Sequence, residues 1–306
     1  MTIVTVIGLG AVGASYAARI ADTDPSVEVR VVAAGERAER LRRDGVTVNG
    51  VQHRFAVVEP GEEVVQADLV IVATKCHDLP YAIEELAGHV GPGTAVLSLL
   101  NGITSEAALV RAFPEAYVPL SVCVGIDGVR VGGDVRYTTL GWVELGDRVP
   151  GEPPAPLVRL ERLLTDLGVT CKVRADMVHG LWWKFLVNVG VNQVTALLEA
   201  PYAVVQRPGP ARDLVVAAQR EVVAVAQAEG VDLTEADIAT FLDVMMTLGP
   251  DNYTSMAQDA LAHRRTEVEE FAGAVVRLGE RHSIPTPVND VLLQTFRAKH
   301  DVWGVA

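Results

Sequence analysis

The fold is decided by one stretch near the amino terminus, which reads IVTVIGLGAVG from residue 3 to residue 13. Residues 3–7 are apolar and β-branched, a pattern typical of a buried parallel strand. Gly8, Gly10 and Gly13 follow at the G-x-G-x-x-G spacing, and a segment of helical composition begins at Ala11. There the glycines permit a tight turn, close approach of a pyrophosphate and close packing of helix on strand. The alternative is a glycine-rich turn that binds nothing, but the agreement of strand, spacing and helix favours a dinucleotide site. The predicted contacts are Gly8, Leu9, Gly10, Ala11, Val12 and Gly13.

Strand-like and helix-like segments alternate over the first half of the chain. Further strand-like runs occupy residues 27–32, 69–72 and 95–99, and the first of these is rich in β-branched valine. Segments of helical character lie at residues 11–21 and 79–87. This alternation predicts the α/β class, with a Rossmann-type doubly wound sheet. The Asn49-Gly50 pair predicts a hairpin between strands at 46–48 and 52–56, and residues 135–145 are also expected to be strand-like.

The character of the chain changes after a proline-rich loop at residues 150–156. A helix at 157–167 and a strand at 169–173 are expected to complete the first domain. Helical patterns then follow at 176–198, 211–229, 235–247, 266–281 and 287–299. We therefore predict a dinucleotide-binding Rossmann-type domain at residues 1–174 and an all-α, helical substrate and catalytic domain at residues 175–306.

Composition narrows the choice of partners. The 306 residues carry a formal net charge of −13, and 49% of them are apolar. This charge disfavours nucleic acid and anionic membrane surfaces, so a small-molecule substrate is the expected partner. Three cysteines without a C-x-x-C pair, and histidines without metal-binding spacing, predict reduced thiols and no metal site. With no leader or apolar span recognised, we expect a cytoplasmic protein.

The end of the second predicted strand bears on the choice of dinucleotide. An NAD site usually has a carboxylate there to hold the ribose diol, whereas this chain has Ala33 and Ala34. Glu36 lies close by, and Arg37 could supply a guanidinium to a 2′-phosphate. NADP (NADPH) is therefore favoured, and NAD stays open. The other arginines of this segment, Arg40, Arg42 and Arg43, are expected to form a solvated helix face.

A helix in the second half carries polar residues at a regular spacing. Lys184, Asn188 and Asn192 recur every four positions in an otherwise apolar segment, so they share one face. Buried polar groups need partners, and this face could present an ammonium and two amides to a polar cleft. Hydrogen bonding between helices, with a lysine that reaches solvent, is an equal alternative.

A second polar cluster lies between residues 254 and 269. Ser255 with Gln258, and Thr266 with Glu269, have the spacing of capping boxes, which predicts two helices with a break between them. Capping alone would account for Ser255. Glu267 could serve only as a first-turn carboxylate that complements the helix dipole.

Together these residues resemble the ketopantoate reductase (2-dehydropantoate 2-reductase) family over nearly the whole chain. In the first domain the resemblance rests on the glycine motif, on Ala73-Thr74-Lys75 and on Asn101-Gly102. In the second it rests on Leu181-Trp182-x-Lys184, Asn188, Asn192-x-x-Thr195-Ala196, Ser255-Met256-x-Gln258-Asp259 and Arg265-Thr266-Glu267. It implies a nicotinamide-dependent reductase whose site lies in a cleft between the sheet's carboxyl edge and the helical domain.

The resemblance also implies roles for single residues. Lys184 would be the general acid that protonates the ketone oxygen, and Glu267 would position lysine and substrate. Ser255, Asn188 and Asn192 would hold substrate oxygens. Asn101 would lie near the nicotinamide and the reacting carbon, and Lys75 would contact cofactor or substrate.

Several positions depart from the family pattern. Ala34 stands where members carry an arginine for the 2′-phosphate, with Arg37 as a substitute. Leu100, Thr104 and Tyr202 replace residues around the expected substrate pocket. The leading expectation is NADPH-dependent reduction of a 2-oxo acid, 2-dehydropantoate to (R)-pantoate in pantothenate biosynthesis. The alternatives are a relative in secondary metabolism that reduces another 2-oxo or 3-oxo compound, and a non-catalytic dinucleotide sensor. The oligomeric state stays open, with a homodimer as one alternative.

Overall fold

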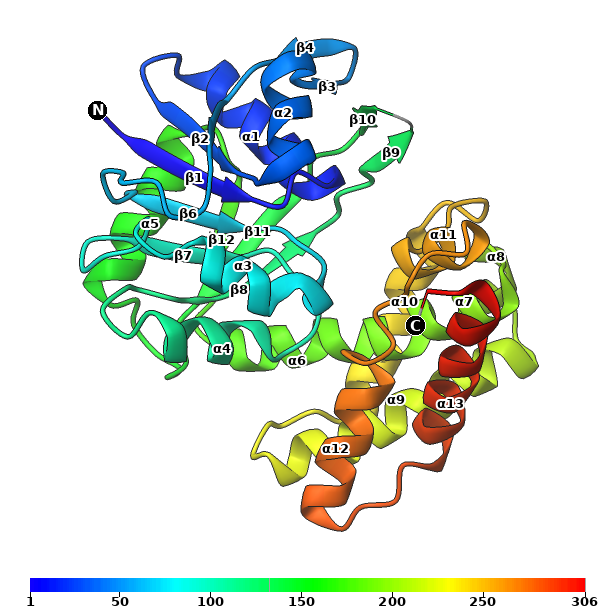
Figure 1. Cartoon of the computed structure of the whole chain (residues 1–306). Helices are drawn as coiled ribbons and strands as arrows, with labels where there is room; N and C mark the ends of the chain where they lie inside the picture. Colours follow the sequence, from blue (N-terminus) through cyan, green and yellow to red (C-terminus); the bar gives the residue numbers. More distant parts are fainter. Residues whose placement is uncertain (132, 306) are drawn as a thin grey trace. The chain divides into compact units, whose positions relative to one another are not determined.

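The computed structural model describes residues 1–131 and 133–305 (Figure 1). Contacts between Cα atoms divide the chain into two compact units. The first comprises Met1–Leu100 and Thr104–Val178, and the second comprises Asn101–Ile103 and His179–Ala306. The short segment Asn101–Ile103 is thus grouped with residues far from it in the sequence.

The first unit contains a five-stranded parallel sheet with strand order β5-β2-β1-β6-β7 (Figure 1). Its strands are β1 (Ile3–Ile7), β2 (Glu28–Val32), β5 (Ala56–Val58), β6 (Leu69–Val72) and β7 (Ala95–Ser98). In the register of the central strands, Val4 of β1 lies opposite Val29 of β2 and Leu69 of β6. This sheet, with its crossover helices, confirms the predicted Rossmann-type α/β class.

Alternating residues of the strands build two cores, one on each face of the sheet. Val4 and Val6 face the core that contains Tyr16 and Ile20 of α1. Ile3 and Ile7 face the other core, with residues of α3 and α4. The helices of this unit are α1 (Ala11–Thr23), α2 (Gly35–Asp44), η1 (Cys76–Asp78), α3 (Leu79–Glu85), α4 (Ser105–Ala112) and α5 (Ala155–Asp166). Burial of both faces explains why these strands are predominantly apolar.

Two smaller sheets complete the first unit. One has the order β4-β3-β10-β9, formed by β3 (Val46–Val48), β4 (Val51–His53), β9 (Val129–Val131) and β10 (Asp134–Arg136). The other has the order β12-β11-β8, formed by β8 (Leu120–Val124), β11 (Trp142–Gly146) and β12 (Cys171–Val173). The hairpin at Asn49-Gly50 is confirmed.

Two strand boundaries differ from prediction. The predicted strand 52–56 is divided between β4 and β5, because β5 pairs with β2 in the large sheet instead of continuing the hairpin. The predicted strand 135–145 is likewise divided between β10 and β11. Gly141 lies between them at φ +70°, and a Cβ there would collide with the carbonyl oxygen of Val124. This turn therefore requires glycine.

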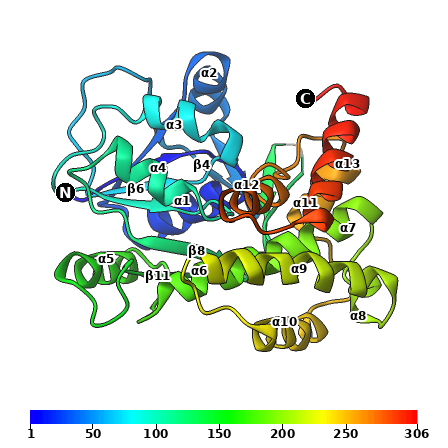
Figure 2. The ribbon, with the colours of Figure 1, turned by 90° about the horizontal axis from the view of Figure 1, so that it is seen from below.

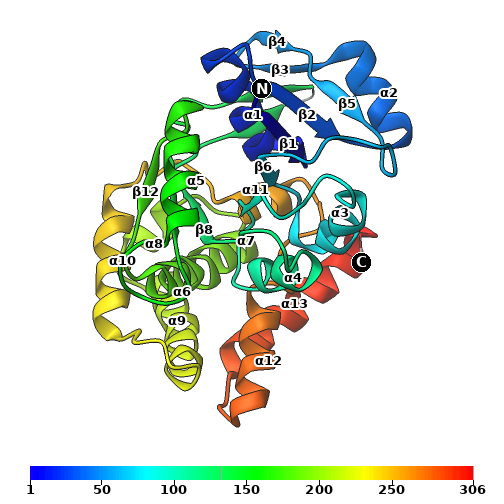
Figure 3. The ribbon, with the colours of Figure 1, turned by 90° about the vertical axis from the view of Figure 1, so that its left-hand side faces the viewer.

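The described part of the second unit has helices as its regular secondary structure, as predicted. They are α7 (Gln193–Leu198), α8 (Ala203–Gln206), α9 (Pro210–Ala228), α10 (Glu235–Thr247), α11 (Ser255–Leu261), α12 (Ala272–His282) and α13 (Pro287–Trp303). They follow α6 (Met177–Val187), which crosses the unit boundary, and the π-helical segment η2 (Asn188–Asn192). Helix α9 packs against η2, α8, α10, α12 and α13 (Figure 2). Helices α12 and α13 lie side by side (Figures 1 and 3). Within the described residues, no helix has the length and apolar character needed to span a membrane.

Candidate active site

The glycine loop between β1 and α1 has the geometry that its spacing predicts. Gly8 adopts φ +92°, and a Cβ on it would lie 2.5 Å from the backbone carbon of Ala73. A Cβ on Gly13 would collide with the carbonyl oxygen of Gly8. A Cβ on Gly10, by contrast, would meet no atom within 4 Å. Gly8 and Gly13 are therefore required by close packing, whereas Gly10 borders open space.

The surroundings of this loop fit a dinucleotide. Gly10 is the N-cap residue of α1 and makes no side-chain cap, so the first N–H groups of the helix remain for phosphate oxygens. Thr74, in the loop that packs on Gly8, has a buried Oγ1 without a hydrogen-bond partner among the described residues. A buried hydroxyl of this kind needs a partner, and a bound ligand would supply one. Lys75, the next residue, is half-buried at the N-cap of η1.

At the end of β2, Ala34 is the N-cap residue of α2 and Arg37 lies exposed in the first turn. Two arginines further along this helix have acidic partners. Arg42 pairs with Glu59 at 2.6 Å and Arg43 pairs with Asp44 at 2.8 Å. Arg40, Arg42 and Arg43 are all exposed, as expected for a solvated helix face.

In the second unit, the predicted long helix from residue 176 to residue 198 contains a π-helical turn. Gly190 allows this turn to pack on α9, because a Cβ there would lie 2.7 Å from Cγ of Gln219. Gln219 donates to the carbonyl of Leu186 at 3.3 Å, and Gln193 donates to that of Val189 at 2.8 Å. These added donors compensate for the altered backbone hydrogen bonding.

Three predicted site residues form one hydrogen-bonded chain within this unit. The amide of Asn188 donates to Oδ1 of Asn101 at 3.3 Å, and the amide of Asn101 donates to Oε2 of Glu267 at 3.3 Å. Asn188 is 2% exposed and Glu267 is 4% exposed. The chain joins the π-helical turn, the segment after β7 and the loop before α12. A buried carboxylate is thereby held beside two amides.

The remaining predicted residues of this unit lie on α6, η2 and α11. Lys184 is half-buried on α6, one turn before Asn188. Asn192 is buried at the end of η2. Ser255 is exposed as the first residue of α11, and the cap of that helix is Thr254, whose Oγ1 accepts from the N–H of Ala257 at 3.1 Å. The prediction of a Ser255 cap is therefore wrong, since Thr254 performs that role.

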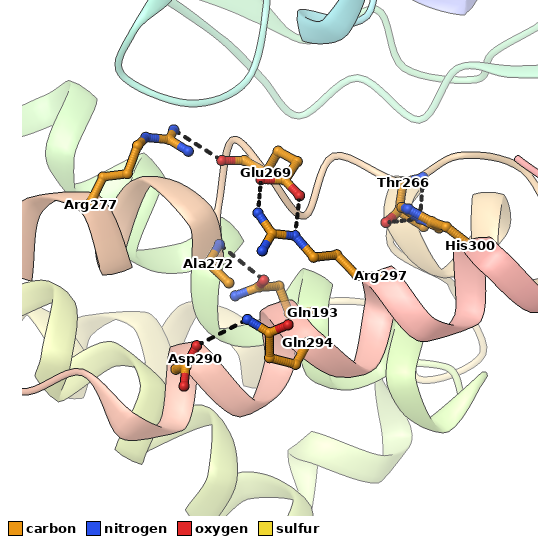
Figure 4. A network of polar contacts seen from close by, with 9 residues as sticks. All are labelled: Gln193, Thr266, Glu269, Ala272, Arg277, Asp290, Gln294, Arg297 and His300. Carbon is orange, nitrogen blue, oxygen red and sulfur yellow. Dashed lines mark hydrogen bonds and ion pairs between the residues drawn. The ribbon is translucent and has the colours of Figure 1, made fainter. Parts of the chain in front are cut away.

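The loop that carries Glu267 is fixed at both ends. The N–H of Thr266 donates to Nε2 of His300 at 3.1 Å, so that ring nitrogen is unprotonated (Figure 4). The N–H of Ala272 donates to Oε1 of Gln193 at 3.1 Å (Figure 4). The predicted helix start and capping box at Thr266 are wrong, because α12 begins at Ala272.

Glu269, the other half of the predicted capping box, also has a tertiary partner. It forms two hydrogen bonds with Arg297 of α13, at 2.7 and 3.0 Å (Figure 4). This pairing with Arg297 holds the pKa of the Glu269 carboxyl below its usual range. Contacts with α13 thus replace local capping on both sides of Glu267.

One further residue, which the sequence did not single out, contacts the glycine loop. Arg130 of β9 donates to the carbonyl of Leu9 at 2.7 Å. It lies in a strand distant in sequence, and an exposed arginine has no local pattern that would mark it. Within the described residues, no group of three or more His, Cys, Asp or Glu side chains could hold a metal ion.

A Rossmann-type domain with an open glycine loop, followed by helices that carry a polar cluster, is typical of nicotinamide-dependent oxidoreductases. The sequence profile described as ketopantoate reductase PanE/ApbA matches residues 4–150, and the corresponding C-terminal profile matches residues 176–300. The chain therefore belongs to the ketopantoate reductase family of NAD(P)-dependent 2-oxo acid reductases.

Individual relatives match over the whole chain. A 2-dehydropantoate 2-reductase of Streptococcus pyogenes serotype M3 is 28% identical over 307 residues, covering 99% of both chains. The ternary structure of D-mandelate dehydrogenase with NADH and anilino(oxo)acetate has a TM-score of 0.86 at 24% identity, covering 100% of both chains. The dimeric ketopantoate reductase from Staphylococcus aureus has a TM-score of 0.81 at 24% identity, covering 99% of this chain and 100% of that one. The two structures show the same fold.

Proposed function

We propose that this protein reduces 2-dehydropantoate to (R)-pantoate with NADPH, in pantothenate biosynthesis. Residues 1–174 bind the dinucleotide in this proposal, and residues 175–306 bind the substrate. The observation that carries the proposal is the hydrogen-bonded chain Asn188–Asn101–Glu267, which brings three of the predicted site residues together. The full-length match to a 2-dehydropantoate 2-reductase supports the choice of substrate.

The residues have defined roles in this reaction. Bound NADPH supplies the hydride that adds to the carbonyl carbon. Lys184, in its ammonium form, donates a hydrogen bond to the carbonyl oxygen and transfers a proton to it as alkoxide charge develops. The lysine is left as a neutral amine and regains a proton from solvent.

Glu267 and the side-chain amide of Asn101 position the groups that take part in the proposed proton transfer. In this proposal the carboxylate of Glu267 complements the positive charge of Lys184 and helps to position the substrate. Asn101 is fixed between Asn188 and Glu267, so its amide is oriented before substrate binds. Ser255 and Asn192 provide further donors for the substrate oxygens.

A second candidate function is reduction of an aryl 2-oxo acid, the chemistry that the name D-mandelate dehydrogenase indicates for the structural neighbour. The observation that favours it is Tyr202, an aromatic residue at the N-cap of α8 that contacts the segment before α11. Its N–H donates to the carbonyl of Asn252 at 2.9 Å. Burial raises the pKa of the Tyr202 phenol, so this side chain is neutral and offers an aromatic face.

The test measures NADPH and NADH oxidation with 2-dehydropantoate and with phenylglyoxylate. We expect a higher kcat/KM for 2-dehydropantoate, and the reverse order would favour the second candidate. Lys184→Ala should lower kcat about 100-fold or more while dinucleotide binding persists. Lys172→Ala is the matched control, because Lys172 is exposed on β12 and stacks on Trp142. Dinucleotide binding without turnover of either acid by the wild type would overturn the proposal in favour of a sensor.

The oligomeric state is part of the proposal. We propose a homodimer, since the relative from Staphylococcus aureus is described as dimeric. Sedimentation equilibrium distinguishes a dimer from a monomer of 32.7 kDa. A single monomeric species at the concentrations used for the activity assay would contradict the proposed homodimer.

A further inference from the structure

Three arginines of the first unit, Arg37, Arg40 and Arg130, form no ion pair with a carboxylate in the part of the chain that the structure describes. Arg40 also lies within electrostatic range of Asp44, without a direct contact. Of the four arginines on α2, Arg42 and Arg43 pair with carboxylates. The side chains of Arg37 and Arg40 make no hydrogen bond or ion pair with any residue in the part of the chain that the structure describes. They are three positions apart and therefore lie on one face of the helix.

The third arginine comes from another sheet. Arg130 of β9 is fixed by its hydrogen bond of 2.7 Å to the carbonyl of Leu9, within the glycine motif. Arg130 is exposed overall, but partial desolvation of its guanidinium lowers its pKa, and the charges of Arg40 and Arg37 lower the pKa further. Three guanidinium groups thus lie within electrostatic range of one another, an arrangement that is unfavourable unless an anion joins them.

We infer that Arg37, Arg40 and Arg130 form one anion site, here named the arginine cluster, and that it holds the 2′-phosphate of NADPH. The inference rests on the proposed function and adds to it a residue of β9 that determines cofactor selectivity. Arginine is well suited to this role, because its planar donors match phosphate oxygens and its charge is permanent.

The location favours the 2′-phosphate over the pyrophosphate. In a Rossmann-type site the pyrophosphate lies at the start of the first helix, whereas the adenosine ribose lies at the end of the second strand. Arg37 and Arg40 belong to α2, which is separated from the end of β2 by two residues. Ala34, the N-cap of α2, carries no charge that would repel a phosphate. Glu36 is the carboxylate in the first turn, and a ribose diol held by Glu36 would instead favour NADH.

The experiment measures equilibrium binding by calorimetry for NADPH, NADH, 2′,5′-ADP and 5′-ADP. For Arg130→Ala we expect the Kd of NADPH and of 2′,5′-ADP to rise about tenfold or more, as expected for loss of a charge-assisted hydrogen bond. The Kd values of NADH and 5′-ADP should rise much less, so the NADPH to NADH preference falls. Arg40→Ala should act in the same direction. Arg43→Ala, on the same helix but paired with Asp44, is the control and should leave the preference unchanged.

The outcomes separate the inference from the proposed function. An equal rise in Kd for all four ligands would place Arg130 at the pyrophosphate and overturn the inference. Unchanged Kd values in an Arg130→Ala variant that unfolds thermally like the wild type would also overturn the inference about the arginine cluster. The reductase proposal would still stand. A wild-type protein that binds neither dinucleotide would refute the proposed function itself. If Arg130→Ala fails to fold, the preference for NADPH over NADH is measured in Arg130→Gln and in Arg40→Ala instead.

Discussion

Glu106 should make the protein less stable as the pH rises, and Glu106→Gln should remove that dependence. The carboxyl group lies in the first turn of α4 and is 2% exposed. Burial raises its pKa from 4.5 to about 7, outweighing hydrogen bonds from Ser105 and from backbone N–H groups and the charge of Arg148. Among the described residues, no cation forms an ion pair with this carboxyl, so its ionisation is unfavourable in the folded state.

The sign and size of this pH effect on the free energy of unfolding follow from the linkage between protonation and folding. Below about pH 4.5 the group is protonated in both the folded and the unfolded state, and no penalty exists. As the pH rises to about 7, the unfolded chain loses the proton first and stability falls. A difference of about 2.5 between the two pKa values is equivalent to roughly 3 kcal/mol, which is lost by about pH 8.

Urea unfolding monitored by circular dichroism, from about pH 5 to about pH 8, tests this prediction. Glu106→Gln should gain about 3 kcal/mol relative to wild type between these limits. Glu115→Gln, an exposed glutamate that follows the same helix, should show the wild-type pH dependence. A constant difference between wild type and Glu106→Gln across the whole pH range would refute the reasoning. It would mean that the carboxyl group is solvated or paired in the folded protein.

Two pairs of neighbouring substitutions separate packing from binding. Gly13→Ala should destabilise the protein by about 2 kcal/mol or more, because its Cβ meets the carbonyl of Gly8. Gly10→Ala should change stability by less than about 1 kcal/mol and yet weaken dinucleotide binding about tenfold. Similar thermal shifts for the two variants would contradict this. Thr254→Ala should cost about 1 kcal/mol through loss of the cap, whereas Ser255→Ala should retain stability and raise KM about tenfold. A destabilised Ser255→Ala with an unchanged KM would show that the serine is structural.

Sequence patterns located the elements whose determinants are local. The strand, glycine loop and helix of residues 3–23 depend on contiguous apolar residues and on glycines that sterics require, so this unit could be predicted closely. Helix α10 likewise has a local capping box, formed by Thr234 and Asp237, and its predicted bounds of 235–247 are those observed. Such features involve only neighbours in the sequence.

The features that the sequence did not reveal depend on distant partners. The π-helical turn at residues 188–192 depends on Gln219 of α9, which no local pattern indicates. The loop that carries Glu267 is non-helical because His300 and Arg297 of α13 engage residues that would otherwise cap a helix. Arg130 reaches Leu9 from a strand more than a hundred residues later. Tertiary contacts of this kind override local propensity.

The most direct test of the central claim follows the hydride itself. NADPH deuterated at C4 is incubated with the protein and 2-dehydropantoate, and the hydroxy acid is analysed by mass spectrometry and NMR. The account predicts pantoate that carries one deuterium, at C2, with formation about 100-fold slower or more in Lys184→Ala. Formation of unlabelled pantoate, or equal rates for wild type and Lys184→Ala, would contradict it.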